Sequence, residues 1–216
     1  MQPFKTVPFK FTDEAFNWLN KFIEPIIDDY QKNAVSNSGL VNLKDPQLKA
    51  LLNSKVWIEV LKFSKENSLL EPYPQLFIYK TLKKPRDTCL GNPHIDTKGT
   101  GGIETTVHMR LNIRLIGEDS TEMVWWDYDR THEHVVSNQF INTSGILTGR
   151  LQARGDTLEE QWGILGLPHY RANNLTMIQE YASFVRTDIL HALNWTGNQP
   201  RVLLSIRFKN KWSDLI

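Results

Sequence analysis

The chain carries metal-binding residue types at two places that lie far apart in the sequence. His94 and Asp96 form a His-x-Asp unit just after a predicted strand, and His191 follows 97 positions after His94. Side chains two residues apart on a strand share a face, so His94 and Asp96 can converge on one ion. His191 must then come from a distant strand that the fold brings close. The three residues predict a metal site made of two imidazoles and one carboxylate.

An arginine at a fixed distance from the second histidine makes this pattern more specific. Two imidazoles and a carboxylate on one face of iron(II) leave the remaining positions open for a co-substrate and oxygen. Arg201 lies ten residues after His191, at the start of the last predicted strand. Its guanidinium is permanently charged and forked, which suits a buried carboxylate better than the point charge of lysine does. A 2-oxo acid, held by the ion at one end and by Arg201 at the other, fits this set.

Helical patterns are confined to the first part of the chain and strand patterns to the rest. Residues 12–34 have apolar side chains at helical spacing behind a Thr12 cap, a second helix is expected to start with Asp45 as its cap and Pro46 as its first residue, and a third follows from Ser54. From Pro72 onward, short segments rich in β-branched and aromatic residues predict strands. We expect a single domain over 1–216, with a helical layer over 1–70 and a β-rich core, sandwich or jelly roll, over 71–216.

Two of these strands have one apolar and one polar face. Residues 107–115 and 201–208 alternate with period two, so that His108, Arg110, Asn112 and Arg114 share a face of the first strand. The polar rows either line the inside of a barrel or face solvent, and periodicity alone does not choose between these arrangements.

Composition sets the broad class of protein. The 216 residues are 40% hydrophobic and 23% charged, which is typical of one globular domain. Lysine and arginine total 25 against 24 acidic residues, so no overall field attracts nucleic acid or anionic lipid. No apolar run reaches the ~18 residues of a membrane span. The lone Cys89 forms no intrachain disulfide, which fits a reducing compartment and predicts a cytoplasmic protein.

The pattern of His94-x-Asp96, His191 and Arg201 in a β-rich chain with N-terminal helices resembles the iron(II)- and 2-oxoglutarate-dependent dioxygenase superfamily over residues 73–209. The resemblance implies a double-stranded β-helix (jelly-roll) core with a helical layer packed on one sheet. It also implies that His94, Asp96 and His191 are the catalytic iron ligands and that Arg201 binds the distal carboxylate of 2-oxoglutarate. The reaction that it implies is hydroxylation of a substrate, with release of succinate and CO2.

Three further residues resemble co-substrate contacts of this superfamily. Many members have a serine two positions after the arginine, whereas this chain has Leu203 there and Ser205 two residues later on the same face. Tyr79 lies in the strand before the His-x-Asp unit, and Asn112 lies in a strand motif similar to one near the co-substrate. We therefore expect Tyr79, Asn112 and Ser205 to be candidate cofactor-binding residues beside Arg201.

Other polar and aromatic residues have simpler explanations. For Arg110 and Arg114 the alternatives are contact with a substrate acid and a solvated place on the surface, and the surface is expected, since long charged side chains keep their head groups in water. Trp125, Trp126 and Tyr128 belong either to a substrate-facing loop or to the core, and burial is the more common fate of such large aromatic residues.

Two other function classes fit the same residues. The first is a cupin-like metalloenzyme that uses the same ligands without 2-oxoglutarate, and the second is a non-catalytic jelly-roll binding protein in which the spacing is coincidental. For an oxygenase, the substrate is a small molecule, a free amino acid or a protein side chain. Nucleic-acid and membrane partners are not expected, and the sequence does not indicate an oligomeric state.

Overall fold

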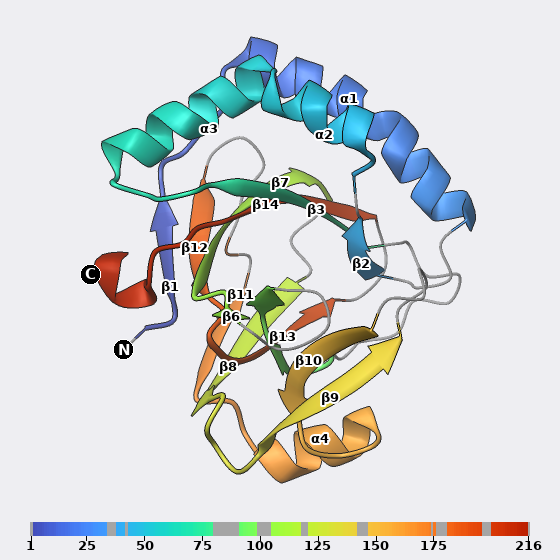
Figure 1. The fold of residues 1–216 in the computed structure, drawn as a ribbon, viewed down its shortest axis with the longest axis vertical. Coiled ribbons are helices and arrows are strands. Elements are labelled where there is room, and N and C mark those ends of the chain that lie inside the picture. Colours follow the sequence, from blue (N-terminus) through green and yellow to red (C-terminus); the bar gives the residue numbers. More distant parts are fainter. Residues whose placement is uncertain are drawn as a thin grey trace.

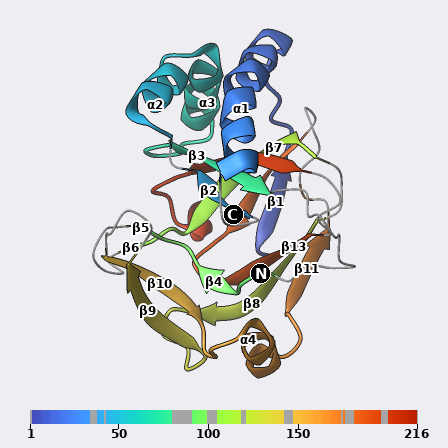
Figure 2. The same ribbon diagram turned by 90° about the vertical axis from the view of Figure 1, so that its right-hand side faces the viewer.

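Two six-stranded antiparallel sheets face each other, with helices on their outer sides (Figure 1). The computed structural model describes residues 2–33, 38–41, 43–79, 91–98, 105–117, 121–141, 147–173, 175, 181–195 and 200–215. Its helices are α1 (Asp13–Asn33), α2 (Asp45–Leu52), α3 (Lys55–Glu66) and α4 (Leu158–Leu165), with a short 3-10 helix at Trp212–Leu215. Helices α1 to α3 lie together over one sheet and α4 lies at the opposite end of the molecule, against the other sheet (Figure 2).

Strand neighbours in both sheets come from distant parts of the chain. The first sheet has the order β1 (Phe4–Val7), β12 (Ala182–Arg186), β7 (Met109–Ile116), β14 (Arg201–Arg207), β3 (Tyr73–Tyr79) and β2 (Ser38–Val41). The second has the order β11 (Tyr170–Asn173), β8 (Thr121–Asp129), β13 (Ile189–Trp195), β4 (His94–Ile95), β10 (Leu147–Ala153) and β9 (Val135–Ile141). A separate ribbon pairs β5 (Thr97–Lys98) with β6 (Thr105–Thr106). This arrangement confirms the predicted jelly-roll core with a helical layer on one sheet.

Polar caps start the helices close to the expected positions. The Thr12 hydroxyl accepts the amide N–H of Ala15 at 3.3 Å, and the Ser54 hydroxyl accepts that of Trp57 at 3.3 Å, so both predicted caps are confirmed. The predicted Asp45 cap is wrong, because α2 starts one residue earlier with Lys44 as its cap. The Lys44 amide donates to the side chain of Gln47, and Asp45 lies in the first turn, where a negative charge is favourable.

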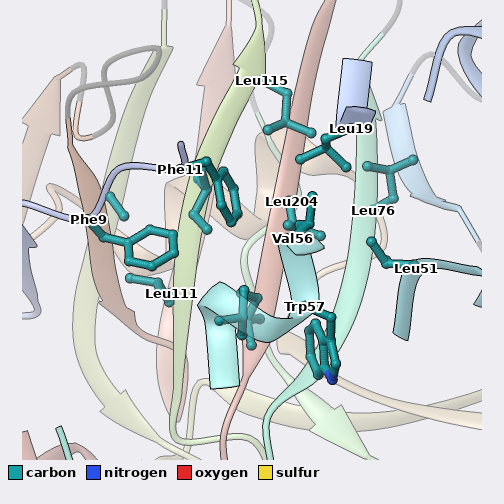
Figure 3. Close-up of a cluster of buried hydrophobic side chains, with 14 of the residues drawn as sticks. Phe9, Phe11, Leu19, Leu51, Val56, Trp57, Leu76, Leu111, Leu115 and Leu204 are labelled. Carbon is teal, nitrogen blue, oxygen red and sulfur yellow. The ribbon is translucent and has the colours of Figure 1, made fainter. Parts of the chain in front are cut away.

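The main hydrophobic core fills the space between the helical layer and the first sheet. Leu19 of α1 and Trp57 of α3 pack with Leu111 of β7 and Leu204 of β14, and all four are at most 5% exposed (Figure 3). Complete burial of each such side chain contributes about 1.5–3 kcal/mol. The apolar faces of β7 and β14 therefore point to the helices, and their polar faces point into the barrel between the sheets.

Several elements differ from the sequence prediction. Strands β1 and β2 come from the region expected to be only helical, and they extend the first sheet by pairing with β12 and β3. Helix α4 was not predicted, although Thr157 and Glu160 form a capping box at its start. It covers the outer face of the second sheet, where the rings of Trp126 and Trp162 meet edge-to-face at 4.9 Å.

Candidate metal centre and co-substrate pocket

The fold brings the three predicted metal ligands together inside the barrel. His94 is on β4, Asp96 follows this strand directly, and His191 is on β13, directly opposite His94 in the register. Asp96 Oδ1 lies 3.5 Å from His94 Nε2 and 4.0 Å from His191 Nε2. One ligand atom from each residue lies within 4.8 Å of the others, and no other group of this kind occurs among the described residues.

The hydrogen bonds of both imidazoles prepare them for ligation. His94 Nδ1 lies 2.7 Å from the carbonyl oxygen of Asn92, and His191 Nδ1 lies 2.9 Å from that of Ile189. A carbonyl oxygen only accepts, so Nδ1 must carry the proton in both rings. Each neutral ring then keeps the lone pair of Nε2, the atom nearer to Asp96, for a metal ion.

The donor spacing requires only a small contraction to hold an ion. Ligand bonds of roughly 2.1 Å place neighbouring donors of one ion about 3 Å apart. The two separations from Asp96 Oδ1, 3.5 and 4.0 Å, are longer than this by no more than about one ångström, and all three donor atoms lie within 4.8 Å of one another. Small side-chain rotations cover such a difference, so the donor set fits a first-row divalent ion.

Asp96 is held as an anion by a buried arginine. Arg110 Nε donates to Asp96 Oδ2, and Arg110 Nη1 donates to the side-chain oxygen of Gln75 on β3. Burial by itself raises the pKa of the Asp96 carboxyl, but the charge of Arg110 and the two histidines outweigh this effect and hold the pKa far below its usual range. Oδ2 is thus occupied by Arg110, and Oδ1 faces the histidines.

His191 is kept neutral by its surroundings. Burial, followed by the nearby His94, lowers the pKa of His191 to about 4, while Asp96 acts in the opposite direction. Neutral imidazole is the form that binds a metal ion, so His191 is ready to ligate across the physiological pH range.

Arg201 lies in the interior with unused hydrogen-bonding capacity. It is 7% exposed, and its Nε and Nη1 have no hydrogen-bond partner within the described part of the chain. Burial lowers its pKa to about 10, with Tyr79 opposing this shift and Arg114 adding to it, so the side chain stays charged at neutral pH. Its guanidinium lies 5.4 Å from the ring centre of Tyr79, whose own pKa is raised by burial. Within the described part of the chain, this buried cation forms no ion pair, so its charge calls for an anion.

A pocket begins at Arg201 and continues between the sheets. It has an empty volume of about 290 Å³, open solvent included, and Asn112 and Arg201 are polar residues in a mainly apolar lining with Met123, Val185 and Leu193. Leu193 is two residues from His191, so the pocket wall and the metal site share β13. Ser205 donates to Asn112 Oδ1 at 2.6 Å, and this bond fixes the amide beside the pocket.

Contacts on the outer side of the second sheet position the strand that carries His94. Gly91, just before β4, donates to the buried side chain of Asn194 at 3.0 Å and accepts from the Trp162 indole at 3.1 Å. A Cβ at Gly91 would lie 2.2 Å from the carbonyl oxygen of Leu193, so only glycine permits this approach of the two backbones. These hydrogen bonds and the close packing hold the strand that carries His94 against the strand that carries His191.

Several sequence expectations are revised by burial. Arg110 and Arg114 were expected on the surface, but they are only 7% and 4% exposed, because the polar face of β7 points into the barrel. Sequence reasoning missed Gln75 as the partner of Arg110; its position on the interior face of β3 is evident only with the register known.

The large aromatic residues of β8 belong to the core, as the sequence favoured. Trp125 and Trp126 are completely buried, and Tyr128 is half-buried. Cys89 lies outside the described residues.

Solved structures of other proteins share this fold, although sequence comparisons find no match. No protein-family model matches the sequence, and no curated protein has a significant sequence match. EvdO2 from Micromonospora carbonacea var. aurantiaca superposes with a TM-score of 0.59 at 12% identity, covering 96% of this chain and 86% of that one, and has also been solved with 2-oxoglutarate. SnoK, a non-heme alpha-ketoglutarate-dependent carbocyclase from nogalamycin biosynthesis, gives 0.54 at 11% identity over 96% and 79% of the two chains.

A third structure, EctD from S. alaskensis with 2-oxoglutarate and 5-hydroxyectoine, has a TM-score of 0.50 at 13% identity, covering 99% of this chain and 73% of that one. The protein thus has the fold of the iron(II)- and 2-oxoglutarate-dependent oxygenases, as the sequence resemblance implied. Among the described residues, no helix combines the length and apolar character needed to cross a membrane.

Proposed function

We propose that the protein is an iron(II)- and 2-oxoglutarate-dependent oxygenase that hydroxylates a small molecule, an amino acid or a protein side chain. One observation carries the proposal: a barrel with this fold contains both a His94–Asp96–His191 donor set and a buried, charged Arg201 whose Nε and Nη1 lack a partner among the described residues. A cupin-like metalloenzyme without 2-oxoglutarate would need the donor set but would leave the state of Arg201 unexplained.

Each residue has a defined role in this proposal. His94 Nε2, His191 Nε2 and Asp96 Oδ1 would hold the iron on one face, and Arg110 would keep the second carboxylate oxygen away from it. When bound, iron(II) and 2-oxoglutarate supply the oxidising chemistry, in which dioxygen is consumed, succinate and CO2 are released and a C–H bond is hydroxylated. The protein residues orient these reactants and exclude water.

The pocket favours 2-oxoglutarate as the co-substrate. Arg201 would form a bidentate pair with the carboxylate farther from the metal, and its partnerless donor atoms would then be satisfied. Asn112, held by Ser205, and Tyr79 lie beside this end as candidate contacts. Met123, Val185 and Leu193 line the pocket with apolar surface, which strengthens the ion pair by lowering the local dielectric constant. The cytoplasmic location expected from the single cysteine remains a prediction.

The test is an anaerobic titration that needs no knowledge of the substrate. Metal-free protein receives iron(II) and then 2-oxoglutarate, and the visible charge-transfer band of a chelated 2-oxo acid is recorded. We expect the band in the wild type, its loss in His94→Ala and His191→Ala, and no change in His134→Ala, a half-buried histidine outside the donor set. Binding of iron without the band would favour the cupin-like alternative, and absence of metal binding would favour a non-catalytic protein.

A further inference from the structure

The interior face of the first sheet is arranged in rows of side chains that cross β3, β14 and β7. In the register, one row contains Tyr73, Arg207 and Arg110, and the next contains Gln75, Ser205 and Asn112. Arg201 and Tyr79 lie at the other end of the same face. Arg110 contacts Asp96, so the Tyr73–Arg207–Arg110 row is at the metal end and Arg201 is at the far end.

Two cations lie directly opposite each other in the row at the metal end. Arg207 and Arg110 are register partners on neighbouring strands, and like charges in such positions destabilise a sheet. The interior face of β3, β7 and β14 carries Arg110, Arg114, Arg201 and Arg207 but no carboxylate. This face is thus a strongly positive surface that needs anions from elsewhere.

The two opposed arginines differ in how they are satisfied. Arg110 is paired with Asp96 and Gln75. The Arg207 guanidinium stacks at 4.3 Å from the ring centre of Tyr73, and within the described residues its side chain has no ion pair and donates no hydrogen bond. Burial, followed by the charge of Arg110, lowers the pKa of Arg207, and the opposing effects of Tyr73 and Asp96 do not cancel this shift. An oxyanion beside Arg207 would oppose this shift.

Solvent access distinguishes the Arg207 end from the Arg201 end. Arg201 and Ser205 are buried, whereas Arg207 is half-buried and Tyr73 is 40% exposed. His94 is also partly exposed, with 30% of its side chain accessible. The side chains of Arg207, Tyr73 and His94 are therefore more accessible to solvent than that of Arg201.

We propose that Arg207, stacked on Tyr73 and opposite Arg110, is a binding subsite for an oxyanion group of the primary substrate, so that the substrate is an acid rather than a neutral molecule. This inference rests on the proposed function, since it assigns Arg201 to 2-oxoglutarate and leaves Arg207 for the second reactant. The forked guanidinium pairs with a carboxylate or a phosphate through two parallel hydrogen bonds. Such a pair would hold the substrate at the metal end of the interior.

Phosphorus NMR of inorganic phosphate tests the subsite. The protein is loaded with manganese(II) and saturated with N-oxalylglycine, which occupies the co-substrate position, and phosphate relaxation is measured as phosphate is added. The paramagnetic ion speeds the relaxation of a phosphate bound nearby, so a saturable effect reports binding close to the metal. The variants are Arg207→Gln, Arg207→Lys and the control Arg171→Gln, an exposed arginine of β11 that pairs with Glu122 at 2.9 Å.

We expect saturable relaxation enhancement in the wild type and in Arg171→Gln, about tenfold weaker phosphate binding in Arg207→Gln, and partial recovery in Arg207→Lys. Equal phosphate binding in wild type and Arg207→Gln overturns the inference. It is also overturned if Arg207→Gln weakens N-oxalylglycine binding about tenfold, because Arg207 would then serve the co-substrate.

The outcome for the metal separates this inference from the proposed function. If manganese(II) does not bind to the wild type, the proposed function fails. Phosphate binding to the metal-free wild type and to Arg207→Gln, measured from the phosphorus line width, then still decides whether Arg207 binds an oxyanion. Thermal unfolding of each variant establishes that it is folded before its binding is compared.

Discussion

Replacing Arg201 by methionine should stabilise the metal-free protein while it weakens the binding of 2-oxoglutarate. A pKa lowered from 12.5 to about 10 corresponds to about 3 kcal/mol of penalty on the charged folded state, at 1.36 kcal/mol for each pH unit. Arg201→Met removes this penalty and keeps most of the side-chain volume, but it also removes the cation–π contact with Tyr79, which contributes about 1 kcal/mol. The net expectation is a gain of about 2 kcal/mol in the free energy of unfolding.

The same substitution should weaken 2-oxoglutarate binding by roughly 100-fold or more. Arg201 can donate two charge-assisted hydrogen bonds to a carboxylate, and their loss costs about 3 kcal/mol or more. The binding is measured from the charge-transfer band with iron(II) under anaerobic conditions. Stability is measured by urea unfolding of metal-free protein, and the melting temperature should rise by about 2–4 °C for each kcal/mol gained.

Arg171→Met is the matched control, because Arg171 is on the outside of the barrel with half of its side chain exposed. Arg171→Met should appreciably change neither the stability of the metal-free protein nor its affinity for 2-oxoglutarate. The reasoning is refuted if metal-free Arg201→Met is no more stable than the wild type, since Arg201 would then already have its compensating anion within the protein. Unchanged 2-oxoglutarate affinity in the same variant would remove Arg201 from the co-substrate site.

Three other perturbations follow from the geometry of the candidate metal centre. Because the pKa of His191 is about 4 in the folded state and 6.5 in the unfolded state, the unfolded state binds more protons between these pH values. From pH 7 to pH 5 the free energy of unfolding of the metal-free wild type should therefore fall by about 2 kcal/mol more than that of His191→Gln, and equal losses in urea unfolding contradict the pKa shift. Asp96→Ala should lower the free energy of unfolding of the metal-free protein by about 3–5 kcal/mol, the usual loss when one partner of a buried ion pair is removed. The double variant with Arg110→Met should recover most of this loss in denaturant unfolding, and no recovery would mean that Arg110 is not the charge left unpaired. Gly91→Ala should lower the free energy of unfolding by about 2–4 kcal/mol and weaken metal binding. The control Gly163→Ala, whose Cβ meets no atom within 4 Å, should be neutral or slightly stabilising. A Gly91→Ala variant that is stable and binds metal disproves the close approach of Gly91 to β13.

The sequence was most informative where local pattern and chemistry coincide. Thr12 and Ser54 start their helices as expected, because a cap is a hydrogen bond between neighbours in the chain. Strand alternation correctly separated the two faces of β7 and β14. Helix α4 was missed although its capping box was visible at Thr157 and Glu160, since eight residues give too short a stretch for helical periodicity.

The side to which the polar faces point could not be derived from periodicity. Polar rows of antiparallel strands face solvent more often than they line an interior, so the sequence favoured a surface position for Arg110 and Arg114. Their burial follows from the pairing of β7 with β12 and β14 and from the helices that cover the opposite face. Likewise, Gln75 had no local signal, because its contact with Arg110 joins residues 35 positions apart.

The sequence by itself determined the types and spacing of the chemical groups: two histidines, a carboxylate and an arginine in a β-rich chain with N-terminal helices. These properties are local, or were interpreted through a resemblance to known oxygenases. Tertiary structure decided that the polar rows face inward, that Arg110 takes one oxygen of Asp96, and that Arg201 and Arg207 lie at opposite ends of one interior face. Such contacts depend on strand register and on which face is buried, and both are set by packing between distant segments.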